Sequence, residues 1–416
     1  MRVIKYFLSI LILTFSTSVF AQNIIAKRVW VGAEVLVKDS LELIQGKRIG
    51  IVTNHSSIVF NKMLLVDTLA KRNDVKVIAL FGPEHGIRGD NADGAKIVNG
   101  KDSVTGIPVY SLYGEINKPT KEMLKDVDIL LFDIQDVGAR FYTYISTLFY
   151  AIQAAAENNI PIIVLDRPNP IGGLNVNGPI LKPKLKSFVG IAPIPIMHGM
   201  TIGELAEYFN NPELLGNNLK ANLSVIKMKN WDRKFYYDRC KLNWVKPSPN
   251  ISYILTAIVY PGMCLLEGTN ISEGRGTEFP FLLFGAPFLD SKKVISELKK
   301  QNVAGIELNP ETFIPKEIPG VASNPKYKGE TCQGIKISIR DRYKFDPVNF
   351  AIKLLYVLNK VHSKDFKFKD SRFDKLAGDA KLREMILEGK NPDSIIQSWQ
   401  KELDDFIQIR NKYLLY

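Results

Sequence analysis

Between Lys47 and about Pro170, short β-branched apolar runs alternate strictly with amphipathic stretches, and this alternation constrains the fold more than any other feature. The stretches between the runs have the apolar spacing of helices. Because the runs contain few polar residues, we expect strands that are buried on both faces of a parallel sheet. The sequence therefore predicts a Rossmann-like, doubly wound, mostly parallel α/β sheet. The expected strands are 48–54, 75–82, 107–111, 128–136 and 160–168, and the expected helices are 62–73, 118–126 and 142–159.

The second half of the chain departs from this alternation. Thr201 and Glu204 have the spacing of a capping box, which predicts a helix start, and residues 335–362 predict a strand followed by an Asp-Pro helix start and an amphipathic helix. A chain of 416 residues is long enough for two domains. We expect a Rossmann-like N-terminal domain over residues 22–190 and a second, smaller α/β domain over residues 191–416.

The first residues have the pattern of a secretory leader. Arg2 and Lys5 precede an apolar run over residues 6–13, and small residues stand just before Gln22. The run is shorter than the ~20 apolar residues of a membrane-spanning helix, and no later segment is long and apolar enough. The pattern predicts a signal peptide over residues 1–21, export to the periplasm or the medium, and no stable membrane insertion after cleavage.

Charge and cysteine content exclude several classes of protein. The net charge of +12 suits an anionic partner, but the basic residues are dispersed, which together with export argues against nucleic acid. Three widely spaced cysteines, Cys240, Cys264 and Cys332, allow one disulfide at most and no thiolate metal site. A dinucleotide fingerprint, a P-loop, a nucleophile elbow and a zincin motif are all missing, so we expect no cofactor.

Polar residues follow four of the expected strands, at Asn54–Ser56, Glu84–Gly86, Asp133–Asp136 and Asp166–Asn169. In open α/β sheets, ligands bind at the carboxyl ends of the strands. A single polar strand end is explained by turn or cap chemistry, whereas four at one sheet edge indicate a site. A second polar loop, over residues 260–281, has too little apolar content to be core and is also expected to be functional.

The carboxylates in these loops are the main candidates for catalytic groups. Hydrolysis of a glycosidic bond needs a carboxylic acid to protonate the leaving oxygen and usually a second carboxylate. Glu84 follows an apolar run, which suits a general acid, although a capping or salt-bridged glutamate would fit the segment equally well. The other loop carboxylates are Asp90, Asp133, Asp136, Asp166, Glu267 and Glu273.

Arginines and tyrosines in the same loops favour a sugar that carries an acid group. Tyrosine stacks on sugar rings and hydrogen-bonds their hydroxyls, and arginine binds carboxylates with two parallel hydrogen bonds. We expect one of Tyr142 and Tyr144 to begin a buried helix instead of serving the site. The arginines are Arg88, Arg140, Arg167 and Arg275.

Six motifs in order carry a family resemblance. They are FGPEHGIRG, DIQDVGARFYTY, LDRPNPIGG, PIMHGMTIGELA, KPSPN and YPGMCLLEGTNISEGRGTEFPF, and together they resemble the NamZ-like exo-β-N-acetylmuramidases, a glycoside hydrolase family formerly of unknown function. The resemblance implies an enzyme of cell-wall turnover and recycling that releases N-acetylmuramic acid (MurNAc) from the non-reducing end of peptidoglycan fragments such as MurNAc-GlcNAc. It also implies an active site in a cleft between the two domains.

The resemblance assigns roles to individual residues. Glu84 in the PEHG motif is expected to be the catalytic acid, with Glu273 as its partner and Glu267 or Asp136 as alternatives. Whether the configuration is retained depends on the separation of the two carboxyl groups, and an acetamido sugar also allows substrate-assisted chemistry. The residues expected to bind substrate are His85, Arg88, Gln135, Asp136, Arg140, Tyr142, Asp166, Asn169, His198, Glu267, Asn270 and Arg275.

Two other functions stay open at this stage. A two-domain α/β cleft also suits a muropeptide-binding protein without catalysis. Alternatively, His55, His85 and His198 lie in turns and could hold the metal of a metal-dependent hydrolase, although we expect no metal site.

Overall fold

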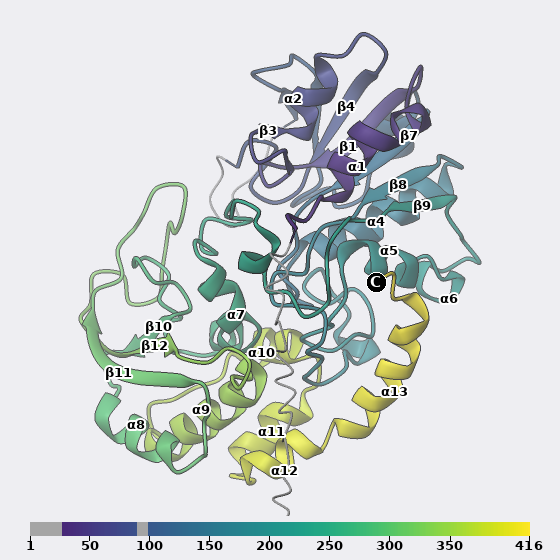
Figure 1. Ribbon diagram of the computed structural model, residues 1–416. Coiled ribbons are helices and arrows are strands. Elements are labelled where there is room, and N and C mark those ends of the chain that lie inside the picture. The colour runs from purple at the N-terminus through teal and green to yellow at the C-terminus, as the bar shows by residue number, and fades with distance from the viewer. Residues whose placement is uncertain (1–26, 90–98) are drawn as a thin grey trace, which may run out of the picture.

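The computed structural model describes residues 27–89 and 99–416, so the expected leader and Asp90 lie outside the described residues (Figure 1). Within them, seven strands form one sheet in the order β5-β6-β4-β1-β7-β8-β9. Every neighbouring pair is parallel except β5 and β6, which confirms the predicted fold class. The strands are β1 (Arg48–Thr53), β4 (Lys76–Gly82), β5 (Gly100–Lys101), β6 (Pro108–Ser111), β7 (Ile129–Asp133), β8 (Ile162–Leu165) and β9 (Leu223–Ile226).

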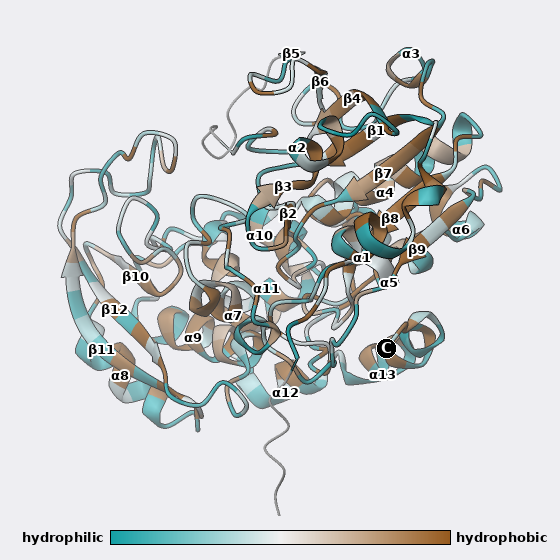
Figure 2. Cartoon of the chain, turned by 45° about the horizontal axis from the view of Figure 1, so that its top comes forward, coloured by the Kyte–Doolittle hydropathy of each residue, from teal (hydrophilic) through white to brown (hydrophobic). Residues whose placement is uncertain are grey.

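Helices cover both faces of this sheet, because successive strand residues point to opposite sides. Phe132 of β7 packs in one apolar cluster with α4 (Tyr144–Glu157) and α5 (Ile202–Phe209). Leu131, its neighbour, packs in a second cluster with α1 (Gly32–Asp39) and α2 (Leu65–Ala70). Figure 2 shows β1, β4 and β7 as apolar strands between these layers. The doubly wound arrangement follows from strands that are apolar on both faces.

The expected helices are present but shorter than their patterns. Residues 62–73 form β3 (Met63–Leu64) and then α2, and residues 118–126 contain only the four-residue α3 (Lys121–Leu124). The strand β3 pairs with β2 (Ile58–Val59). Gly32 allows α1 to approach the sheet closely, since a Cβ at this position would lie 2.4 Å from the backbone nitrogen of Asp166.

The second region contains an antiparallel sheet in the order β10-β12-β11, formed by β10 (Leu283–Ala286), β11 (Ile306–Phe313) and β12 (Cys332–Ile339). The predicted strand and Asp-Pro helix start are confirmed: Asp346 caps α9 (Pro347–Val361) and Pro347 is its first residue. The remaining helices are α6 (Pro212–Leu215), α7 (Ile254–Met263), α8 (Ser291–Lys299), α10 (Asp370–Ala377), α11 (Lys381–Leu387), α12 (Pro392–Gln397) and α13 (Gln400–Arg410).

The two regions share one core and exchange segments. A single apolar cluster extends from Phe81 in β4 to Phe350 in α9 and Phe406 in α13. The large sheet takes β9 from residues 223–226, beyond residue 190, where we expected the first domain to end. The end of the chain returns to this sheet, with α13 beside α5 (Figure 1), and the Tyr416 hydroxyl donates to Asp166 over 2.7 Å. Among the described residues, no helix is long and apolar enough to cross a membrane.

Candidate active site

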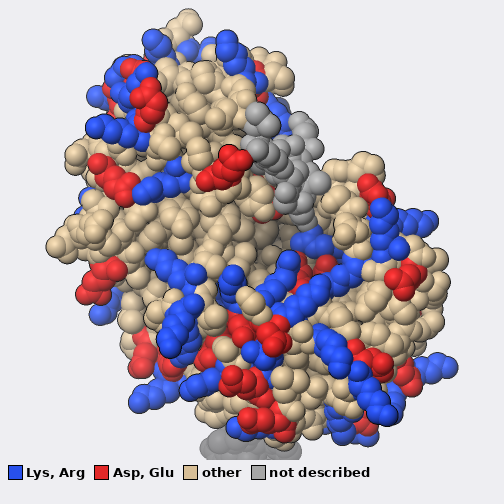
Figure 3. All heavy atoms as spheres, turned by 180° about the vertical axis from the view of Figure 1, so that it is seen from behind, with Lys and Arg blue, Asp and Glu red and all other residues tan. Residues whose placement is uncertain are grey.

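A cavity of about 880 Å³ lies at the carboxyl end of β4, between the large sheet and the C-terminal region. Its wall combines the loops after β4 and β7 with the 264–281 segment, residues 321–326 and the start of α10. The two polar loops singled out in the sequence therefore face one cavity. From behind, Figure 3 shows basic side chains around a hollow between the upper and lower parts of the molecule. The predicted site residues in its wall are Glu84, His85, Tyr142, Glu267, Glu273 and Arg275.

Glu84 lies in the tight turn that ends β4. His85 and Gly86 both have a φ of +73°, and the Gly86 nitrogen donates to the carbonyl of Pro83. The Thr143 hydroxyl donates to Oε2 of Glu84 over 3.1 Å, and the hydroxyl of Tyr113 also hydrogen-bonds this carboxylate. Burial raises the pKa of Tyr113, and the charge of Glu84 adds to this, so the phenol stays protonated and can donate. Glu84 is therefore an oriented, half-buried carboxylate at the cavity wall.

Aromatic rings form the part of the wall next to Glu84. The Tyr142 ring meets Tyr144 at 4.8 Å and Tyr260 at 6.0 Å, and Tyr260 meets Phe281 at 4.9 Å, all close to edge-on. Burial raises the pKa of Tyr142 and of Tyr260, so both remain neutral phenols. Tyr144 begins α4 and donates to the carbonyl of Pro247 over 2.6 Å, so one tyrosine of the pair does begin a buried helix, but its side chain also lines the cavity.

A second carboxylate pair faces the cavity from the C-terminal region. Glu267 binds Arg275 at 2.9 Å and Arg372 at 2.5 Å. Glu273 lies 2.9 Å from the ammonium of Lys326 and 3.5 Å from Nε of Arg275. The ammonium of Lys326 also donates to the carbonyls of Leu266 and Ile271, at 2.7 and 2.8 Å.

Burial sets the electrostatics of this pair. It raises the pKa of Glu267, and the neighbouring charge of Glu273 raises it further. Burial also lowers the pKa of Arg275 to about 10, which still leaves it charged at neutral pH. For Arg372, burial would lower the pKa, but the charge and hydrogen bond of Glu267 outweigh it and raise the pKa. Glu267 therefore holds two guanidinium groups in place, whereas Glu273 is held by one ammonium and one longer contact.

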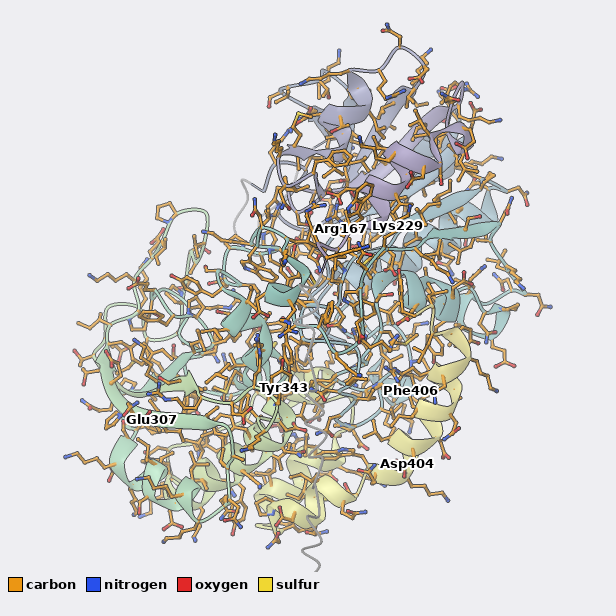
Figure 4. All side chains as sticks on the ribbon, viewed as in Figure 1. Arg167, Lys229, Glu307, Tyr343, Asp404 and Phe406 are labelled. Atoms are coloured by element: carbon orange, nitrogen blue, oxygen red, sulfur yellow. The ribbon has the colours of Figure 1, made fainter. Side chains whose placement is uncertain are left out.

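Two predicted substrate-binding arginines are engaged elsewhere and lie outside the cavity wall. Arg88 pairs with Asp67 and Asp102, at 2.9 and 2.7 Å. Arg140 is fully buried and donates to four carbonyl groups, and burial lowers its pKa to about 9. These carbonyls belong to Pro179, Ile194, Leu376 and Ala377. A third loop arginine, Arg167, labelled in Figure 4, forms a two-bond pair with Asp133 between the ends of β7 and β8.

Six other predicted binding residues also lie outside this wall, where they connect loops. Gln135 donates to the carbonyls of Asp136 and Pro168. Asn169 donates to Met200. Asn270 bonds Asp365 and Lys367. Asp166 accepts from Thr201, Gly203 and Tyr416. Nε2 of His198 lies 3.6 Å from Oδ2 of Asp136. The structure therefore does not bring Gln135, Asp136, Asp166, Asn169, His198 and Asn270 to the cavity.

The three histidines of the metal alternative do not converge. His85 lines the cavity, while His198 is buried next to Asp136 and His55 contacts the carbonyl of Lys246. Within the part of the chain that the structure describes, no three His, Cys, Asp or Glu side chains are placed to hold a metal ion.

The cavity wall also contains residues that the sequence did not predict. Ser248 and Asn250 belong to the KPSPN motif and were not assigned a role. Three basic residues at the start of α10 and within it were expected only as part of a dispersed basic surface. Tyr113 and residues 321–326 have no motif that would have identified them. These basic residues are Lys369, the N-cap of α10, and Arg372 and Lys375 within it.

The fold and the cavity define a Rossmann-like α/β protein with a carboxylate-lined cleft closed by a C-terminal region. Family models described as the N-terminal and C-terminal parts of exo-β-N-acetylmuramidase NamZ match residues 49–254 and 258–416. The chain belongs to this family, as the six motifs predicted. The two family models meet between residues 254 and 258.

Known relatives agree with this assignment. The peptidoglycan β-N-acetylmuramidase NamZ of Bacillus subtilis (strain 168) is 45% identical over 404 residues, which are 96% of this chain and 95% of that protein. Two crystal structures of DUF1343 family proteins from Bacteroides fragilis NCTC 9343 have the same fold. The first has a TM-score of 0.86 at 36% sequence identity, and the second has a TM-score of 0.77 at 37% identity. Each comparison covers 94% of this chain and 99% of the Bacteroides chain.

Proposed function

We propose that this protein is an exo-acting β-N-acetylmuramidase. It hydrolyses the glycosidic bond that links a terminal N-acetylmuramic acid to the next sugar of a peptidoglycan fragment, with MurNAc-GlcNAc as the simplest substrate. Family membership and the Bacillus subtilis relative support the reaction. The observation that carries the proposal is that Glu84 and the Glu267–Glu273 pair face one cavity.

Glu84 acts as the general acid in this scheme. Thr143 and Tyr113 orient its carboxyl group at the cavity wall, where it would protonate the leaving oxygen of a bound sugar. The neighbouring tyrosine wall offers flat apolar surface for a sugar ring and phenol donors for its hydroxyls.

Glu273 is the better partner of the two C-terminal carboxylates. Both oxygens of Glu267 bind guanidinium groups, which leaves it poorly suited to activate water or attack carbon. Glu273 has a single close cation, Lys326, and can serve as base or nucleophile. In substrate-assisted chemistry, the acetamido group of the sugar would replace this attack, and Glu273 would instead stabilise positive charge.

The direct test is incubation of the purified protein with MurNAc-GlcNAc across a range of pH. We expect mass spectrometry to detect free MurNAc and GlcNAc in equal amounts. Intact disaccharide at every pH would contradict the proposal, and tight binding without products would instead identify a muropeptide-binding protein. NMR of the first product formed gives the anomeric configuration and separates retention from inversion.

We also propose that the protein is exported and that residues 1–21 are removed. The leader pattern of Arg2, Lys5 and the apolar run supports this. The mass of the protein recovered outside the cytoplasm is expected to correspond to a chain that begins near Gln22. A full-length chain that remains in the cytoplasmic fraction would contradict export.

A further inference from the structure

The cavity wall contains more cations than carboxylates. Five basic residues stand against three glutamates, which are Glu84, Glu267 and Glu273. Three of the basic residues are engaged: Arg275 and Arg372 bind Glu267, and Lys326 binds Glu273. The other two, Lys369 and Lys375, form no ion pair with a carboxylate of any described residue.

Lys369, the N-cap residue of α10, and Arg372 and Lys375 within the helix form a row along it. Residues three apart on a helix are neighbours on one face, and six residues rise by about 9 Å, so the two lysines flank Arg372 on the cavity side. All three side chains are exposed, so the lysine ammoniums are hydrated when no ligand is bound. The charge of Lys369 also acts on a residue of the site. Burial lowers the pKa of Lys326, and repulsion by the charge of Lys369 lowers it further.

The orientation of this row is fixed by the rest of α10. The backbone nitrogen of Lys369 donates to the carbonyl of Gly268 over 2.8 Å, which ties the helix start to the Glu267 segment. Phe373 is fully buried against Phe368, with ring centroids 4.6 Å apart. Asp374 pairs with Arg383 at 2.9 Å. These contacts hold the helix in place, so the backbone positions of Lys369 and Lys375 stay at the cavity wall.

We propose that Lys369 and Lys375 form a carboxylate-binding subsite that selects acidic sugars. The inference rests on the proposed function, because muramic acid differs from glucosamine by an ether-linked lactic acid. The arginines expected from the sequence to bind this acid are used elsewhere: Arg88 and Arg140 lie outside the cavity, and Arg275 is bound to Glu267. An incoming carboxylate would replace water on the two lysines and offset the excess positive charge.

Two carboxylates could occupy the subsite. One is the free lactyl acid, and the other is an acid of a stem peptide, present when the lactyl group is amidated. Both offer the same chemistry to an ammonium group. Loss of a hydrogen bond to a charged group corresponds to a change of ~10- to 100-fold. We expect this change mainly in KM, because the contact is made before and during the reaction alike.

The experiment compares three chromogenic MurNAc glycosides: the free lactyl acid, its carboxamide, and the lactyl-L-Ala-D-Glu form. The variants are Lys369→Met, Lys375→Met and the double substitution. Lys381→Met, on the next helix and outside the cavity, is the matched control. The double variant is expected to lower kcat/KM for the free acid by ~10- to 100-fold and to leave the carboxamide within about twofold. A loss confined to the peptide form would assign the subsite to the stem acid.

Binding gives an independent readout that does not need turnover. Calorimetry of MurNAc and GlcNAc is expected to show that the wild type prefers MurNAc and that the double variant loses this preference. Equal losses on acid and carboxamide, or no loss, would overturn the subsite while leaving the enzymatic function intact. A wild type that hydrolyses none of the glycosides would contradict the proposed function, and the binding preference would still decide the subsite.

Discussion

The guanidinium group of Arg140 donates to the carbonyl groups of Leu376 and Ala377, at 2.8 Å each, and so joins the loop after β7 to the end of α10. A residue expected to bind substrate is therefore the connection between the sheet and the helix that closes the cavity. Its other bonds, to Pro179 and Ile194, are also to carbonyls.

Replacing Arg140 by Met is expected to destabilise the protein strongly. The substitution removes four hydrogen bonds to carbonyl groups inside the protein, and losses of ~3–5 kcal/mol in the free energy of unfolding are typical when a buried hydrogen-bonded charge is removed. Denaturant unfolding measures the loss. Arg48→Met, at an exposed ion pair, is the control and should cost under ~1 kcal/mol. Near-native stability of Arg140→Met would contradict a structural role.

Glu84→Gln is expected to reduce kcat by ~10²- to 10⁴-fold, because the amide cannot protonate the leaving oxygen. The hydrogen bond from Thr143 can still be accepted by the amide oxygen, so the fold should be retained. Steady-state kinetics with MurNAc-GlcNAc and a thermal unfolding curve check both points. Glu42→Gln, at an exposed position, should behave as the wild type, and full activity of Glu84→Gln would remove this residue from the catalytic role.

Substitutions of Glu267 and Glu273 should show which of these two glutamates acts in catalysis and which holds neighbouring side chains in place. Glu273→Ala is expected to lose turnover but to regain part of it in azide, a small anion that can take the place of a missing nucleophile or base. Glu267→Ala is expected to lose both stability and activity without rescue, because Arg275 and Arg372 lose their shared partner. Rescue of Glu267→Ala alone would exchange the two assignments.

Asp166 should make stability depend on pH. Burial raises the pKa of Asp166 to about 7, so the folded protein keeps a proton that the unfolded chain releases near pH 4. The stabilisation is full below about pH 4 and is lost as the pH rises toward 7, with a limiting slope of about 1.4 kcal/mol per pH unit. Unfolding curves of the wild type and Asp166→Asn should therefore diverge in this window, and parallel curves would contradict the raised pKa.

The alternation of apolar runs was sufficient to predict the sheet, because strands buried on both faces have a distinctive composition. It also placed Glu84 and Asp166 at strand ends, but it could not show which of the two side chains faces the cavity. One side chain faces the cavity and the other turns toward the returning C-terminus, and both follow an apolar run in the same way. The sequence pattern around a loop does not indicate which distant segment of the chain will pack against that loop. For the same reason, Lys369 and Lys375 looked like ordinary surface charge.

Substitution of Gly274, between Glu273 and Arg275, tests whether the polar loop over residues 260–281 needs its present backbone conformation. Its φ is +80°, and a Cβ at this position would lie 2.2 Å from the carbonyl oxygen of Leu283 in β10. Gly274→Ala therefore combines an unfavourable φ with a backbone clash, and the loop must move away from β10. We expect a loss of more than ~1 kcal/mol in stability and a larger loss of activity, because the flanking Glu273 and Arg275 move with it.

Gly320→Ala is the matched control for this substitution. Gly320 has a φ of +72°, and a Cβ there would meet no atom within 4 Å, so the variant carries the backbone strain without the clash. Stability and kcat/KM of both variants decide between the two causes. Equal effects would mean that strain alone matters, whereas a greater loss of activity in Gly274→Ala would show that contact with β10 positions the second carboxylate.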